Sequence, residues 1–181
     1  MARHAKIPFK MADAFQDKYF SAFPGIAKWH RYVAQQLQTV QRIENSFGVS
    51  RTFFGRPNDD TTLREAIAHG PQSSTAMRTN LAMWRIWRYM SKCELLAQKH
   101  DSITFQFPIA GSCAPEVNVV NHARAYFSTE LTHRGRIFDV GTDVKVGWNW
   151  GKYDAVLNPN GMRKYKGTDT RVRLEGIDRV L

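Results

Sequence analysis

Residues 99–107 read KHDSITFQF, and this stretch decides the fold that we expect. The run LLA at 95–97 and the run ITFQF at 103–107 are β-prone and enclose a polar break, which is the pattern of an antiparallel hairpin. Asp101 then lies in the tight turn, held between two strands. A carboxylate fixed in this way suits Mg²⁺, which requires near-octahedral oxygen geometry. The ordinary alternative is that Asp101 is a solvated turn residue.

The composition favours a basic protein with a packed core. The 181 residues correspond to about one domain, and 43% of them are hydrophobic. The formal net charge is +10 and the isoelectric point is near 9.9. Such a charge favours a polyanionic partner, nucleic acid first and a membrane surface second.

No apolar run approaches the roughly 20 residues of a membrane-spanning helix, and the start shows no signal-peptide pattern. We therefore expect no membrane partner and a cytoplasmic location. Cys93 and Cys113 lack the usual zinc spacing and are too few for a disulfide framework, so we expect both to be reduced.

Helical periodicity precedes the hairpin. It predicts a helix over 11–23 that ends at Pro24-Gly25, and an amphipathic helix with a core stripe from Ile26 to Ile43 that ends by Gly48. A short strand or hairpin arm at 48–58 and a helix over 61–70, capped by Asp59 or Asp60, should follow. We expect Pro71 to open a further long helix that runs to Lys92.

This last helix carries a basic stripe formed by Arg78, Arg85, Arg88 and Lys92. A solvated face is the ordinary interpretation of such a stripe. Because the stripe stands directly before the hairpin in a positively charged chain, we predict that it faces phosphates, with Arg78 and Arg85 as DNA-binding residues.

Beyond the hairpin, the pattern predicts a helix over 114–128 and strands at 137–140 and 144–146. From Lys152 the sequence becomes basic and weakly patterned, so we predict one domain over 1–151 and a basic extension over 152–181. The predicted fold class is α+β, with long helices packed on a small antiparallel sheet that carries the His-Asp hairpin.

Three blocks, in this order, resemble the family A DNA polymerases, the group of bacterial polymerase I and many phage replicative enzymes. They are FFGRPNDDTTLREAIAHGPQSSTA at 53–76, KHDS at 99–102 and VKVGWNWG at 144–151. The resemblance covers roughly 14–152 and implies the C-terminal part of the fingers and an incomplete palm. It implies DNA-directed nucleotidyl transfer and, for a phage gene, a location in the host cytoplasm.

The resemblance also implies roles for individual residues. Asp101 aligns with the palm aspartate that binds two Mg²⁺ ions, and His100 with the histidine that contacts the primer end. Gln72 aligns with the glutamine that touches the minor groove of the primer-template, Arg64 with an arginine near the template strand, and Arg56 with the arginine of the preceding turn. Surface roles at a helix end for Gln72 and Arg64, and a plain turn cation at Arg56, remain the alternatives.

The chain also departs from the family pattern. Ser102 stands where the family usually has glutamate, and Ala68 where relatives often have asparagine. We find neither the second metal-binding aspartate, in its aspartate-x-serine-x-x-glutamate strand, nor the fingers helix that holds the incoming nucleotide. In the family, both precede the part that this chain resembles.

The resemblance therefore implies the C-terminal subunit or fragment of a split polymerase, inactive without an N-terminal polymerase subunit. The assembled enzyme would share two Mg²⁺ ions between the chains and bind primer-template DNA and dNTP. One alternative is a non-catalytic, basic nucleic-acid-binding protein derived from a polymerase scaffold. A second is an unrelated structural protein.

Overall fold

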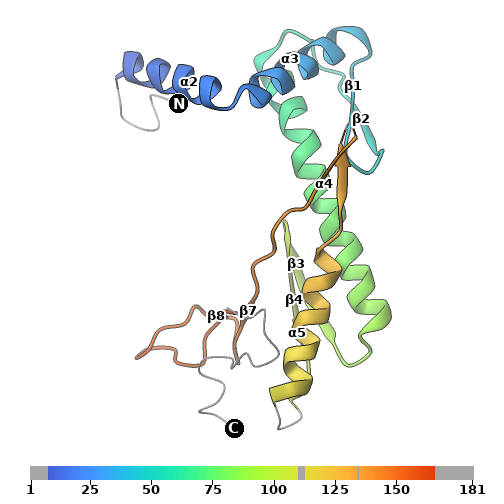
Figure 1. The fold of residues 1–181 in the computed structure, drawn as a ribbon, viewed down its shortest axis with the longest axis vertical. Coiled ribbons are helices and arrows are strands. Elements are labelled where there is room, and N and C mark those ends of the chain that lie inside the picture. The colour runs from blue at the N-terminus through green and yellow to red at the C-terminus, as the bar shows by residue number, and fades with distance from the viewer. Residues whose placement is uncertain (1–7, 110–112, 134, 166–181) are drawn as a thin grey trace. The chain divides into compact units, whose positions relative to one another are not determined.

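The structure, a computed structural model, describes residues 8–109, 113–133 and 135–165 (Figure 1). The chain divides into two compact units, Met1–Ser73 and Ser74–Leu181. None of the helices in these described ranges is both long and apolar enough to cross a membrane.

The first unit is mainly helical. It contains α2 (Phe9–Ala22), α3 (Pro24–Thr39), the strands β1 (Arg42–Glu44) and β2 (Ser50–Thr52), and the beginning of α4 (Asp60–Tyr89). Pro24 occupies the first turn of α3, where its missing N–H costs nothing. Asp59 caps α4, since its Oδ2 accepts a hydrogen bond from the backbone N–H of Thr62 at 3.2 Å. The cap predicted from the sequence is thereby confirmed.

The core of the first unit joins α3 and the beginning of α4 to the β1–β2 hairpin. Its buried members are Val33, Leu37, Ile43, Phe53 and Ala66. The prediction that one helix continues to Ile43 is wrong, because α3 ends at Thr39 and Gln41 adopts a φ of 51°. Ile43 is nevertheless 2% exposed, since it is the one inward-facing residue of β1. Ile43 therefore lies in a strand, and its spacing from the helical residues before it matched the helical period by coincidence.

Helix α4 passes through Pro71 without ending, so the prediction that Pro71 opens a new helix is also wrong. A proline inside a helix leaves the carbonyl of the residue four positions earlier without its donor. Here that residue is Ile67, and the indole of Trp29 donates to its carbonyl oxygen at 3.2 Å. A residue outside α4 therefore compensates for the proline.

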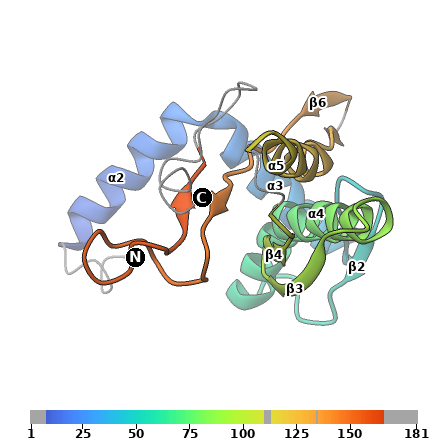
Figure 2. The same ribbon diagram turned by 90° about the horizontal axis from the view of Figure 1, so that it is seen from below.

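The second unit contains the remainder of α4 and several short elements. They are β3 (Glu94–Lys99), β4 (Ser102–Gln106), α5 (Cys113–Phe127), β5 (Leu131–His133), β6 (Arg136–Phe138), β7 (Lys145–Val146) and β8 (Arg163–Lys164). Ala82 and Ile86 of α4 pack against Ala123 and Phe127 of α5 and against apolar residues of β3 and β4. Figure 2 shows these elements side by side.

The mixed helix and antiparallel-strand fold class is confirmed, but the strands of the described ranges do not form one sheet. They form four separate antiparallel pairs: β1–β2, β3–β4, β5–β6 and β7–β8. Helices, rather than further strands, cover the apolar side chains of the β3–β4 pair.

Part of the predicted C-terminal extension packs into the second unit. Lys145 and Val146 of β7 pair with Lys164 and Arg163 of β8. The ring of Tyr165 is 7% exposed and lies in a cluster with Val120 of α5. Residues 152–165 are therefore joined to the preceding segment, whereas 166–181 lie outside the described residues.

Candidate functional site

His100 and Asp101 form the turn between β3 and β4. Lys99 pairs with Ser102, so these two residues are the whole loop of the hairpin. Both side chains are exposed. His100 has a φ of 54°, a left-handed conformation that costs a non-glycine residue on the order of 1 kcal/mol and often marks a functional site.

Helix α4 and the strands hold this turn in place. The buried hydroxyl of Thr79 lies 3.0 Å from the carbonyl oxygen of Thr75 and 3.3 Å from that of Asp101, so its one proton is shared between them. Ser102 Oγ donates to the carbonyl oxygen of Lys99 at 2.8 Å. Two residues before His100, on β3, Gln98 Nε2 donates to Oδ1 of Asn80 on α4 at 2.6 Å. The backbone beneath the Asp101 carboxylate is thus fixed while the carboxylate itself faces solvent.

The residues present fit a metal only in part. Asp101 offers one carboxylate, and a Mg²⁺ ion needs several oxygen donors in octahedral geometry. Within the ranges that the structure describes, no cluster of three or more His, Cys, Asp or Glu side chains could hold a metal ion. The other donors would have to come from another polypeptide, a bound phosphate or water.

Of the two cysteines, the structure describes the side chain of Cys93. Cys93 is a free thiol, and burial raises its pKa, so it stays protonated and weakly reactive at neutral pH. This agrees with the expected reduced state of Cys93, while the side chain of Cys113 lies outside the described part.

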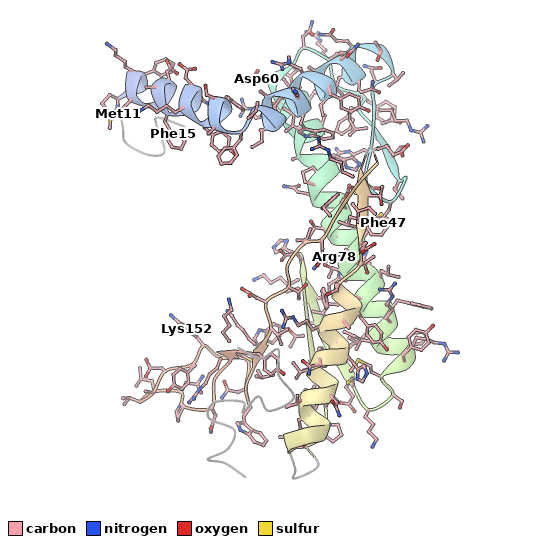
Figure 3. The ribbon with its side chains drawn as sticks, in the orientation of Figure 1. Met11, Phe15, Phe47, Asp60, Arg78 and Lys152 are labelled. Carbon is pink, nitrogen blue, oxygen red and sulfur yellow. The ribbon has the colours of Figure 1, made fainter. Side chains whose placement is uncertain are left out.

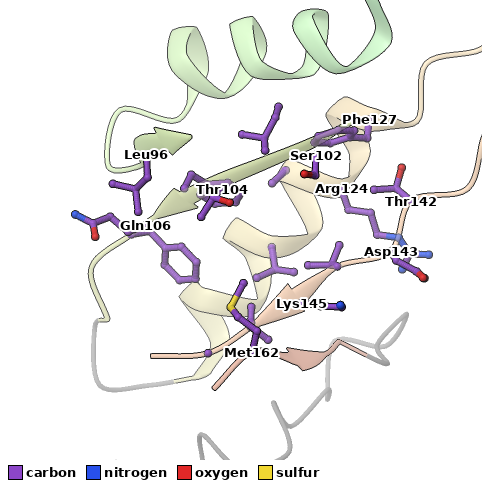
Figure 4. Close-up of a pocket in the computed structure, with 18 of the residues that line it drawn as sticks. Leu96, Ser102, Thr104, Gln106, Arg124, Phe127, Thr142, Asp143, Lys145 and Met162 are labelled. Atoms are coloured by element: carbon purple, nitrogen blue, oxygen red, sulfur yellow. The ribbon is translucent and has the colours of Figure 1, made fainter. Parts of the chain in front are cut away.

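A cavity of about 790 Å³ lies in the second unit (Figure 4). Asp101 and residues of β4 and α5 line it, as do residues 140–150. Arg124 and Lys145 contribute positive charge to its wall, and the carboxylate of Asp143 contributes negative charge. A hydrogen bond of 2.9 Å from Lys164 to Asp143 lowers the pKa of that carboxyl group, so it remains ionised.

Two residues of the predicted basic stripe, Arg78 and Arg85, make contacts inside the protein, whereas Arg88 and Lys92 are exposed. Arg78, labelled in Figure 3, is 4% exposed; its guanidinium donates to the carbonyl oxygen of Val140 and, at 2.6 Å, to Thr142 Oγ1. Arg85 donates to the carbonyl oxygen of Tyr126 and to Thr129 Oγ1 at 3.2 and 2.9 Å. In this structure the side chain of Arg78 is buried and bound within the chain, and the DNA contact predicted for it stays a prediction. Arg85 is half-buried and similarly engaged.

The other predicted DNA-binding residues lie in the first unit. Gln72 and Arg56 are exposed. Arg64 forms an ion pair of 3.0 Å with Asp60 one turn earlier, but its side chain remains 77% exposed. Such an exposed ion pair is weak, so Arg64 can readily exchange the Asp60 carboxylate for another anion. All three side chains are therefore accessible to a nucleic acid.

Sequence reasoning assigned no role to Thr79 or to the two tryptophans of the GWNW block. Nothing local marks Thr79, because its contact with Asp101 joins residues 22 positions apart. Trp148 and Trp150 did carry a signal, since each is a large aromatic residue in a glycine-flanked, polar stretch. They line the cavity and are 44% and 62% exposed.

Comparison with known proteins addresses the family. No family model matches the sequence. The chain is 28% identical over 158 residues to DNA polymerase I of Treponema pallidum (strain Nichols), an alignment that covers 82% of this chain and 15% of that protein. The resemblance to the family A DNA polymerases is thereby confirmed.

The fold is also similar to that of a family A polymerase domain. The solved structure of the POL domain of Pol1 from M. smegmatis, in complex with DNA primer-template and dNTP, matches with a TM-score of 0.62 and 20% sequence identity. The match covers 70% of this chain and 23% of that chain. This chain thus spans less than a quarter of the length of either polymerase and resembles a fragment of one.

Proposed function

We propose that this chain supplies part of the active site of a family A DNA polymerase whose other part lies on an N-terminal polymerase subunit. The observation that carries the proposal is Asp101, an exposed carboxylate in a two-residue turn with a fixed backbone. The similarity to DNA polymerase I supports the same conclusion. In this proposal the isolated chain does not polymerise.

Asp101 donates carboxylate oxygens toward the metal site, and a second aspartate from the partner completes the set. In the two-metal scheme, Mg²⁺ ions about 3.5–4 Å apart stabilise the attacking and leaving oxygens of an in-line displacement. His100 contacts the primer end from the same turn. Its left-handed backbone is the conformation that a two-residue hairpin turn requires, so the turn holds His100 next to Asp101.

Gln72, Arg64 and Arg56 contact the primer-template, and dNTP binds only in the assembled enzyme. The exposure of all three side chains supports this assignment. The solved relative holds primer-template DNA and dNTP, which supports the same substrates here. The guanidinium groups of Arg78 and Arg85 bind carbonyl and hydroxyl oxygens of this chain in this structure.

A second function, non-catalytic binding of nucleic acid, is favoured by one observation. Ser102 replaces the usual acidic residue and its hydroxyl is used within the hairpin, so Asp101 has no neighbouring carboxylate there. The net charge of +10 suffices for binding DNA without chemistry.

Primer extension with and without a partner separates the two functions. The partner is a polypeptide that carries the aspartate-x-serine-x-x-glutamate strand and the fingers helix of a family A polymerase. We expect extension by the mixture with Mg²⁺ and dNTP, and none by either chain alone. Binding of primer-template without any gain in extension over the partner alone would instead support the non-catalytic function.

A further inference from the structure

Two tryptophan side chains of the second unit, Trp148 and Trp150, are exposed to solvent. Trp148 is 44% exposed and Trp150 is 62% exposed, and both line the 790 Å³ cavity. Exposed indole surface is unfavourable in water, and neighbouring exposed aromatic side chains commonly mark a binding site. Asn149 stands between them, so the two indoles are two positions apart in the sequence.

The loop that carries them is braced by its own backbone. Trp148 N–H donates to the carbonyl oxygen of Asn160 at 2.9 Å, and Met162 N–H donates to that of Gly151 at 2.7 Å. The side-chain amides of Asn149 and Asn158 exchange hydrogen bonds of 3.0 and 3.1 Å.

Glycine permits this close crossing of the chain. A Cβ atom added at Gly147 would lie 2.7 Å from the carbonyl oxygen of Gly161, so the two segments approach more closely than any other residue would allow. The loop therefore presents its tryptophans on a fixed support.

The surroundings of the two indoles are aromatic and carry both signs of charge. The acidic residues of the cavity wall are Asp101, Glu116 and Asp143, whereas the segment that holds the indoles is itself basic. Arg124 and Lys145 line the same cavity, as do the rings of Phe105 and Phe107. Residues 144–165 contain four basic residues and one acidic residue. That acid, Asp154, accepts hydrogen bonds from the backbone N–H groups of Val156 and Leu157 and thus serves within its own loop.

We propose that Trp148 and Trp150 form a stacking platform for unpaired bases of single-stranded DNA, with Lys145 and Lys152 close to its phosphates. Aromatic rings stack on every base irrespective of sequence, and nearby cations neutralise the backbone. The proposal rests on the proposed function for the choice of DNA as the nucleic acid. It deepens that function by assigning a strand-binding surface to the GWNW block, whose tryptophans line the same cavity as Asp101.

The test measures binding of the full chain to a fluorescein-labelled 12-mer of deoxythymidine. Fluorescence anisotropy, recorded in EDTA at low salt, reports the binding. EDTA removes divalent cations, so that binding is measured independently of polymerisation. We expect the Trp148→Ala/Trp150→Ala variant to bind about tenfold more weakly or worse, since stacking on one aromatic ring contributes about 1–3 kcal/mol per base.

Helix α4 offers a matched control. Trp84 and Trp87 are 48% and 66% exposed, close to the exposure of the platform residues, and they lie in the same unit. The Trp84→Ala/Trp87→Ala variant should bind like the wild type. The Trp148→Phe/Trp150→Phe variant keeps two stacking rings and should retain most of the affinity. A 12-mer of abasic sites should bind the wild type and the platform alanine variant equally.

Each of four results would overturn the proposal: no binding by the wild type, unchanged binding after Trp148→Ala/Trp150→Ala, an equal loss in the control pair, or an equal loss with phenylalanine. Normal oligonucleotide binding by the alanine variant, combined with loss of partner-dependent extension, would assign these tryptophans to the subunit interface instead. If the platform results hold but no partner yields extension, the proposed polymerase function fails and the strand-binding surface stands.

Discussion

The indole Nε1 of Trp29 donates a hydrogen bond to the carbonyl oxygen of Ile67 at 3.2 Å. In a regular helix that oxygen would accept from the residue at position 71, which here is Pro71 and has no N–H. Close approach of the indole requires Gly70, because a Cβ atom there would lie 2.9 Å from Trp29 Cζ2. Trp29, Gly70 and Pro71 therefore act together to keep α4 continuous.

Trp29→Phe should lower the free energy of unfolding of the first unit by about 1 kcal/mol, because the partly buried carbonyl of Ile67 loses its donor. Denaturant unfolding followed by circular dichroism measures the change. Trp84→Phe, at an exposed position, serves as the control and should change stability little. Adding Pro71→Ala to Trp29→Phe restores a backbone donor for Ile67 and should recover part of the loss; the absence of any recovery would contradict the compensation.

Arg78→Met should destabilise the second unit by about 1–3 kcal/mol or more. The substitution leaves the acceptors at Val140 and Thr142 without their donor and removes the cation 3.9 Å from Asp139. Arg88→Met is the matched control, since Arg88 belongs to the same basic stripe but is exposed. Unchanged stability together with weakened DNA binding in Arg78→Met would favour the phosphate contact predicted from the sequence.

Trp29 and Arg78 illustrate what the sequence can and cannot predict about this fold. The helices over 9–22 and 113–127 and the β3–β4 pair follow local periodicity, and the sequence predicted them closely, but it extended the helix over 24–39 to Ile43. The continuity of α4 depends on Trp29, 38 positions before Ile67. The burial of Arg78 depends on residues 62 and 64 positions later. No local pattern contains such contacts.

The candidate site divides in the same way. Asp101 and His100 were predicted from a short motif that also specifies its own turn. Thr79, which braces this turn, and the exposure of Trp148 and Trp150 result from packing between segments distant in the sequence. The packing of those distant segments determines whether a polar or aromatic side chain is exposed at a site or buried in the interior.

Acidification should destabilise the first unit through His69. Burial, with a smaller effect from the charge of Arg51, lowers the pKa of His69 from its ordinary value of 6.5. Its buried Nε2 has no hydrogen-bond partner in the ranges that the structure describes. The unfolded chain therefore binds a proton more readily than the folded one, and stability falls as the pH drops below 6.5 until it passes the lowered pKa.

Unfolding midpoints measured between about pH 7.5 and 5.5 should show this dependence. His69→Gln should flatten the curve, and His122→Gln, at an exposed position of α5, should leave its slope unchanged. An unaltered slope in His69→Gln would show that another group is responsible.

The most direct test of the central claim is the effect of Asp101→Asn on partner-dependent primer extension. Asparagine retains the size of the side chain and suits a turn, but it removes the charge. The account predicts loss of extension in this variant and retention in Ser102→Ala and in Asp17→Asn, an exposed acid on α2. Partner-dependent extension that survives Asp101→Asn at the wild-type rate would contradict the role of Asp101.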